Sequence, residues 1–171
     1  MKHSPLSILL LFVFACSAAA QSDSTLSLRW KWLVGNWKGE GKGKPGKGYG
    51  GFSLQEQLGG KVLLRQSRSV YPASATMPTV VHEDLTTIYS TTNGDRAMYF
   101  DNEGHKINYA ITYSPGKIML NTDLVQGLPL FRLSYTHVDD RTIRVRFEMA
   151  QDGEHFMTYT DGVCKKITKS R

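Results

Sequence analysis

The fold is decided by residues 33–43, LVGNWKGEGKG. From Trp37 onward, charged residues alternate with an indole and three glycines. Successive side chains of a β-strand lie on opposite faces, so this alternation is typical of a strand with one face in water. We expect Trp37 to point inward. Gly39, Gly41 and Gly43 leave the same face bare, which allows a neighbouring backbone or a ligand to come close.

The rest of the chain has the same alternating character and contains no amphipathic pattern of helical length. The clearest examples are residues 143–149, 131–135 and 107–113, in which every second residue is apolar. We expect these apolar sets to face inward, Tyr109 among them. Short turns such as Asn93-Gly94 separate the segments, because glycine and asparagine tolerate the positive φ of a tight hairpin.

The segments together predict an all-β protein. We expect a single closed antiparallel meander barrel of about ten strands, since closure removes the exposed edges that a flat sheet of this size would have. Apolar residues at near-helical spacing between Leu26 and Val34 predict a short N-terminal helical plug at one barrel end. We assign residues 1–20 to a signal peptide, 21–29 to a linker and 30–167 to the barrel domain.

The first twenty residues are typical of an export signal. A basic start is followed by an apolar run from Leu6 to Phe14, which is too short to span a bilayer, and small residues precede Gln21. We expect cleavage after Ala20 and an exported protein, in the periplasm or secreted. The alternative is lipoprotein processing at Cys16, with a lipid anchor there; the bulky Phe14 fits that motif poorly.

Composition limits the partners. The chain of 171 residues carries a net charge of +6, and loss of residues 1–20 removes only one lysine, which leaves +5. Lys42, Lys44 and Lys47 gather in one glycine-rich loop, but the loop lacks the interleaved aromatic residues typical of nucleic-acid binding. We therefore expect no nucleic-acid partner. Cys164 remains as the single cysteine of the mature chain, so no internal disulfide is expected.

The Gly35-x-Trp37 signature at the start of the first strand, after a short plug segment, resembles the calycins: lipocalins, fatty-acid-binding proteins and their relatives. The Trp-x-Gly-x-Gly run that begins at Trp37 is similar to the opening of nitrobindin-like barrels. Residues 82–84, 99–105 and 131–135 resemble exported bacterial barrels of this type with no assigned activity. The resemblance covers roughly residues 30–167 and implies a barrel that holds a small molecule.

The resemblance also raises haem as a cofactor, because nitrobindins bind haem through a histidine in the last strands. In this chain Tyr159 lies near the place where that histidine is expected, and His155 lies four residues earlier. A tyrosine or a displaced histidine is able to bind ferric haem. Haem stays open as an alternative, and the residues themselves assign no cofactor.

Two further patterns suggest chemistry. Glu83 shares parity with apolar Val81 and Leu85, so we expect it to face inward, where it would act as a proton carrier or pair with Arg65 or Arg68. A buried salt bridge or a misjudged strand register is the favoured interpretation, and we assign no catalytic residue.

The second pattern is a set of potential metal ligands, Asp101, Glu103 and His105. A hairpin turn already accounts for these residue types, because Asn102 and Gly104 make the bend while the acids face water. We therefore favour the turn and assign no metal.

The leading hypothesis is an exported, non-enzymatic barrel that holds a small apolar or amphipathic molecule. The predicted ligand-binding residues, which parity places on the inside, are Trp37, Glu83, Tyr109, His155, Met157 and Tyr159; a β-bulge would change the orientation of the last three. The alternatives are a nitrobindin-like haem protein, an enzyme that uses an inward Glu or His, and a structural module of the envelope.

Overall fold

The computed structural model describes residues 25–75, 77–125 and 127–168. One short helix precedes ten strands: α1 Thr25–Trp30, β1 Gly35–Gly43, β2 Gly46–Gln57, β3 Val62–Tyr71, β4 Val80–Thr91, β5 Gly94–Asp101, β6 Lys106–Ser114, β7 Lys117–Thr122, β8 Leu130–Asp139, β9 Thr142–Ala150 and β10 Met157–Lys166. The predicted signal peptide and the Cys16 anchor lie outside the described residues.

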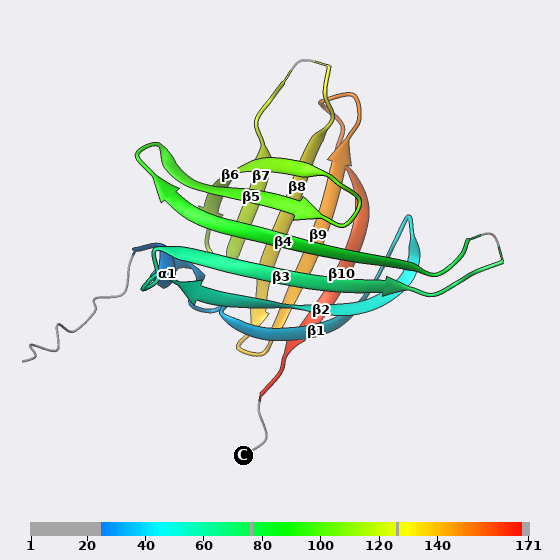
Figure 1. The fold of residues 1–171 in the computed structure, drawn as a ribbon, viewed down its shortest axis with the longest axis horizontal. Coiled ribbons are helices and arrows are strands. Elements are labelled where there is room, and N and C mark those ends of the chain that lie inside the picture. The colour runs from blue at the N-terminus through cyan, green and yellow to red at the C-terminus, as the bar shows by residue number, and fades with distance from the viewer. Residues whose placement is uncertain (1–24, 76, 126, 169–171) are drawn as a thin grey trace, which may run out of the picture.

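The ten strands form one closed barrel in which every strand pairs antiparallel with its sequence neighbour (Figure 1). The first and last strands close it, with Trp37 opposite Lys166 and Gly43 opposite Thr160. The predicted all-β meander barrel with a short N-terminal helix is therefore confirmed. In the described part of the chain, no helix has the length and apolar character needed to cross a bilayer.

The interior is filled at the end that α1 covers. Leu26, Trp30 and Leu33 are buried there beside Trp37, and the Trp30 indole donates a hydrogen bond to the Tyr113 hydroxyl at 3.0 Å. These contacts confirm the predicted plug, and they make this end of the barrel a packed core rather than an entrance.

The predicted inward sets of β6, β8 and β9 are also confirmed. Tyr109, Leu133, Tyr135 and Ile143 belong to the buried core. The arginines that alternate with them face outward, where Arg144 and Arg146 both pair with Asp161 of β10. The polar face of these strands is therefore external, as the sequence indicates.

The glycines of β1 have a backbone role. A Cβ atom built on Gly39 would lie 2.2 Å from the Val163 carbonyl oxygen, and one on Gly43 would lie 2.0 Å from the Tyr159 carbonyl oxygen. On β2, a Cβ atom at Gly50 would meet the Arg68 carbonyl oxygen at 2.3 Å. Neighbouring strands thus occupy the space that side chains would need, as expected where a barrel wall bends sharply.

Two details of the strand bounds affect the side chains around the barrel opening. β2 begins at Gly46, because the glycine-rich segment 46–51 pairs with β1 along its whole length. β10 is one continuous strand to Lys166, with a bulge between Thr158 and Thr160. The bulge leaves Tyr159 without a partner on β9 and shifts the side-chain parity of the strand's start.

Candidate functional site

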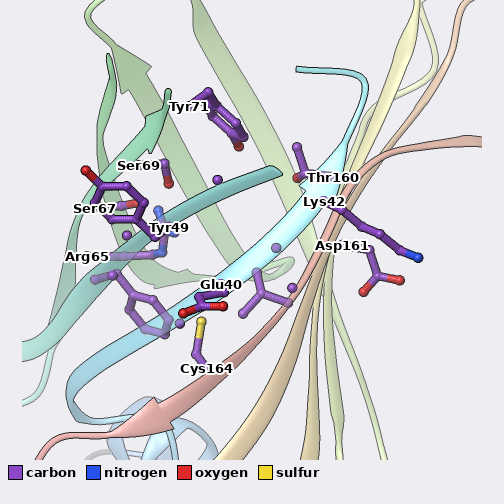
Figure 2. Close-up of a pocket in the computed structure, with 18 residues that line it drawn as sticks. Glu40, Lys42, Tyr49, Arg65, Ser67, Ser69, Tyr71, Thr160, Asp161 and Cys164 are labelled. Carbon is purple, nitrogen blue, oxygen red and sulfur yellow. The ribbon is translucent and has the colours of Figure 1, made fainter. Parts of the chain in front are cut away.

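A cavity of about 110 Å³ lies between β1, β2, β3 and β10. Its walls include the glycines Gly39, Gly41, Gly48 and Gly50, which contribute backbone and no side chains to the lining. Exposed residues such as Tyr49 and Lys42 line its outer part, so the cavity reaches the protein surface. In Figure 2, the polar residues of β3 lie on one side of the cavity, and Thr160 and Asp161 lie on the other.

Strand β3 supplies most of the polar groups. Arg65, Ser67, Ser69 and Tyr71 follow at every second position, so their side chains share the inner face. The Tyr71 ring lies over Gly48, where a Cβ atom would come within 2.6 Å of it. Burial raises the pKa of Tyr71, with a further contribution from Tyr159, so the phenol stays neutral at ordinary pH. The result is a neutral, hydrogen-bonding wall with one cation, Arg65, at its inner end.

The guanidinium of Arg65 is buried in an ion pair with Asp84 of β4. The side chains are only 8% and 7% exposed, and Arg65 Nη1 donates to Asp84 Oδ1. The guanidinium also lies over the Phe52 ring, 4.9 Å from its centroid. Burial works to lower the Arg65 pKa, but the Asp84 carboxylate and smaller contributions from Tyr135, Tyr99 and Cys164 together outweigh it, so the arginine remains charged.

Two buried polar atoms near the Arg65–Asp84 ion pair lack hydrogen-bond partners among the described residues. The Nε of Arg65 and the Oγ1 of Thr86 are both buried and form no hydrogen bond. The two residues lie directly opposite each other on β3 and β4. Buried polar groups nearly always form hydrogen bonds in folded proteins. An unpaired buried N–H or hydroxyl therefore indicates a place where water or another small molecule binds.

A chain of polar contacts leads from Asp84 to the barrel end opposite α1. His82 Nε2 lies 3.9 Å from Asp84 Oδ2 and 2.8 Å from the Tyr99 hydroxyl, while its Nδ1 lies 3.0 Å from Glu103. The Tyr99 hydroxyl donates to Asp101 at 3.1 Å. Burial, followed by the charges of Asp84 and Asp101, raises the Tyr99 pKa. The Tyr99 hydroxyl therefore stays protonated and donates to Asp101, while His82 Nε2 lies within hydrogen-bonding distance of the same oxygen.

The prediction that Glu83 faces inward is wrong. Its side chain is 55% exposed and accepts a hydrogen bond from Arg68 Nε at 3.1 Å, on the outer face. The inner face of β4 instead carries His82, Asp84 and Thr86, each opposite an inward residue of β3. The predicted acid–arginine pair inside the wall does exist, but its acid is Asp84.

The inward orientation expected for His155 is also wrong. The side chain is 80% exposed, and its Nδ1 lies 2.7 Å from Asp152 Oδ2. Asp152 Oδ1 also accepts hydrogen bonds from the backbone nitrogens of Glu154 and His155. The histidine therefore stabilises the turn before β10, and neither it nor Glu83 reaches the cavity as the proton-carrier hypothesis requires.

The other four predicted ligand residues are placed differently. Trp37 and Tyr109 are buried in the packed core; Trp37 stacks on Phe52 at a centroid distance of 6.1 Å and donates its Nε1–H to the Leu33 carbonyl. Tyr159, at the bulge, packs with its ring nearly perpendicular to that of Phe147, and Met157 is exposed. None of the six predicted ligand-binding side chains is among those that line this cavity.

The cavity does not fit haem. None of the four histidines in the described residues lines it, and both ring nitrogens of His82 already have partners. A volume of about 110 Å³ is also well below the roughly 300–1,000 Å³ of pockets for larger organic ligands. Its size suits a group of a few heavy atoms instead.

Asp101, Glu103 and His105, the predicted potential metal ligands, lie together in the turn between β5 and β6. Asp101 accepts hydrogen bonds from the backbone nitrogens of Glu103 and His105 and lies 2.8 Å from His105 Nδ1. Among the described residues, no three His, Cys, Asp or Glu side chains are grouped so as to hold a metal ion. The hairpin interpretation of these residues matches the observed contacts.

The sequence reasoning missed Asp84, Ser67 and Ser69. A usable signal was present: Arg65, Ser67 and Ser69 alternate with Gln66 and Arg68, and His82, Asp84 and Thr86 share a parity. Two polar faces on adjacent strands indicate a polar interior only when the pairing of those strands is known.

Comparison with known proteins bears on the fold alone. No protein-family model matches the chain, and no curated protein sequence matches it. Among solved structures, Rv2717c from M. tuberculosis is similar with a TM-score of 0.60 and 13% identity, over 85% of this chain and 99% of that one. The S-type phycobiliprotein lyase CPES from Guillardia theta has a TM-score of 0.53 and 6% identity, over 88% and 97%. The chain thus shares its closed barrel fold with these two structures.

Proposed function

We propose that this protein is an exported, non-enzymatic binding protein that holds a small amphipathic molecule in the glycine-walled cavity. Barrels of this fold class typically bind a small ligand in their interior. The N-terminal segment of residues 1–20 supports export, because it has the basic start, apolar run and small residues of a signal peptide.

One observation carries the proposal: a buried arginine with an unpaired N–H lines a cavity that reaches the surface. A cavity kept only for packing would be apolar and dry or would be filled by side chains. Here the wall combines the bare backbone of Gly39, Gly41 and Gly50 with the hydroxyl groups of Ser67 and Ser69, so it offers hydrogen-bonding groups beside a small open volume. This composition supports an amphipathic ligand over a purely apolar one.

Native mass spectrometry of the protein purified from its expression host tests the proposal. We expect a fraction of the molecules to carry a small noncovalent adduct that is lost on mild activation. Replacing Ser67 by leucine fills the cavity from the β3 side and is expected to abolish the adduct while the barrel stays folded.

The matched control is Gln66→Leu. Gln66 immediately precedes Ser67 on the same strand, but its side chain lies on the exposed outer face. It adds a similar apolar side chain and should leave the adduct unchanged. An adduct that survives Ser67→Leu, or a wild-type protein that carries none and takes up no small molecule, would contradict the proposal.

A further inference from the structure

A strongly basic patch lies on the outer face of four neighbouring strands, β9, β10, β1 and β2, whose order around the barrel can be followed in Figure 1. It consists of the outward residues of segments 38–42, 47–51, 142–146 and 161–165, which pair in register with one another, and we call it the basic face. Its six cations are Lys38, Lys42, Lys47, Arg144, Arg146 and Lys165, and its two carboxylates are Glu40 and Asp161. Asp161 is already paired with both arginines. An excess of four positive charges thus lies on one face of a chain whose total charge is +6.

The basic face has definite edges, because the arginines on either side of it have acidic partners. On the β8 side, Arg132 lies 3.8 Å from Glu148. On the β3 side, Arg68 pairs with Glu83 of β4 at 3.1 Å. The excess of positive charge is therefore a property of these four strands and does not continue around the barrel wall.

Two pairs of lysines on the basic face stand directly opposite each other. Lys42 of β1 faces Lys47 of β2, and Lys38 of β1 faces Lys165 of β10. All four residues are exposed, and none of them forms an ion pair with another residue in the described part of the chain. Like charges directly opposite each other destabilise a pair of antiparallel strands. A negatively charged partner on this face would remove that repulsion.

The size and the centre of the basic face favour a membrane as this partner. Four strands at a spacing of about 4.8 Å and five residues at about 3.4 Å each give it an area of roughly 300 Å², whereas a stable protein complex buries about 800 Å² per partner. Tyr49 is the one aromatic side chain of the face, so it lacks the successive stacking surfaces that single-stranded nucleic acids need. Tyr49 and Val163 are 51% and 48% exposed between the lysine pairs, and such residues rest among lipid headgroups while the lysines attract anionic lipids.

We propose that the basic face docks this protein on a membrane surface rich in anionic phospholipid. The inference goes beyond the proposed function and does not depend on it, because the charged side chains of the face lie on the outer surface of the barrel wall. Lys42 and Tyr49 also line the outer part of the cavity, so docking would bring the mouth of the cavity to the bilayer.

Sedimentation of the protein with phospholipid vesicles tests the inference. The protein purified from its expression host is mixed with vesicles of phosphatidylglycerol and phosphatidylcholine in equal parts, and separately with vesicles of phosphatidylcholine alone. We expect saturable binding to the anionic vesicles and binding to the neutral vesicles that is weaker by about tenfold or more. Raising the salt concentration from about 0.1 M to about 1 M shortens the screening length from about 10 Å to about 3 Å, so it should release the protein.

Two double variants separate the basic face from the net charge of the chain. Lys42→Gln/Lys47→Gln removes one of the opposed lysine pairs, and the attraction of two lysines to an anionic membrane surface corresponds to about a thirtyfold change in affinity. The variant stays folded, because it relieves a like-charge pair on an exposed surface. The matched control is Lys61→Gln/Lys106→Gln, which removes the same charge from exposed lysines in the turn between β2 and β3 and at the start of β6. It should leave the affinity for anionic vesicles nearly unchanged.

Equal binding to both kinds of vesicle, or no binding to either, would overturn the inference. An equal loss of binding in the control variant would overturn it as well, because net charge and not the basic face would then decide the attraction. Poly-glutamate and a mixed-sequence oligonucleotide are titrated in parallel at the same concentration of negative groups. Tighter binding of either polymer than of the anionic vesicles would assign the face to an acidic protein or to nucleic acid. None of these outcomes bears on the proposed function, which the mass spectrum tests separately.

Discussion

Replacing Gly39 by alanine is expected to destabilise the barrel where β1 meets β10. The new Cβ atom would lie 2.2 Å from the Val163 carbonyl oxygen, 2.7 Å from the Cys164 Sγ and 2.8 Å from the Cys164 Cα. Nonbonded heavy atoms prefer separations of about 3.5 Å, so the β10 backbone would have to move by roughly 1 Å. Two of the three contacts are with backbone, which cannot rotate away as a side chain would.

The size of the effect follows from two opposing contributions. Forcing an extra methyl group into a packed site costs about 1–3 kcal/mol, and a backbone shift places Gly39→Ala at the upper end. Alanine recovers about 0.5–1 kcal/mol, because glycine loses more conformational freedom on folding. We expect a net loss of about 2 kcal/mol in the free energy of unfolding. Gly41→Ala is the matched comparison, because its nearest backbone atoms lie at 3.0 and 3.2 Å and have to give way by only a few tenths of an ångström, so we expect a loss of less than about 1 kcal/mol.

Urea unfolding followed by tryptophan fluorescence measures both variants. Gly39→Ala should lower the midpoint with an unchanged slope, since the barrel still unfolds as one unit. A Gly39→Ala protein as stable as the wild type would refute the conclusion that the β10 backbone fills the space beside this glycine. An equal loss of stability in both variants would refute it as well, because the steric overlap with β10 would then not explain the loss.

Three further predictions follow from buried polar groups and the cysteine. Thr86→Val should raise the free energy of unfolding by about 1 kcal/mol, because it removes a buried hydroxyl without a partner; a loss in urea unfolding would mean that the hydroxyl is hydrogen-bonded. Burial works to raise the Asp95 pKa, but three side-chain hydrogen bonds outweigh it and hold the pKa below the usual value. The stability that Asp95 adds is therefore present above its unfolded pKa of about 3.9 and is lost as the pH falls through the lower folded value. Asp95→Asn should cost about 1–3 kcal/mol at pH 7 and nothing at strongly acidic pH, and a pH-independent difference would contradict this. Burial raises the pKa of the Cys164 thiol, so Ellman's reagent should label it slowly in the native protein and rapidly in urea; equal rates would place the thiol in solvent.

The sequence predicts the barrel well because most strands are apolar inside and polar outside. In β8 and β9 the period-two alternation identifies the buried set directly, as Leu133, Tyr135 and Ile143 show. The closed topology follows from the same pattern together with short turns, since a meander of ten strands buries its edges only by closing. Parity arguments are reliable wherever one face is clearly more apolar than the other.

The candidate site could not be predicted because β3 and β4 break this rule. Their inner faces carry Arg65, Asp84 and Thr86, while the outer face of β4 carries apolar residues such as Val81 and Leu85. Read from the sequence alone, that alternation points Glu83 inward. Only the pairing of the two strands shows that Asp84 completes a buried ion pair, because a cross-strand partner leaves no local trace in the sequence.

The bulge in β10 explains the misplaced C-terminal residues in the same way. One extra residue at Tyr159 changes which side chains face inward, and the turn at Asp152 holds His155 in solvent. A bulge depends on the hydrogen-bonding register with the neighbouring strand, which residue types alone do not determine. The glycines of β1, by contrast, were correctly predicted to permit a close approach, and the group that approaches is the backbone of β10.

A crystal structure of the protein purified from its expression host tests the central claim most directly. The account predicts electron density for a small bound molecule in the cavity between β1, β2, β3 and β10, with an acceptor atom within hydrogen-bonding distance of Arg65 Nε. Density for ordered water alone at Arg65, with the cavity otherwise closed by side chains, would contradict it.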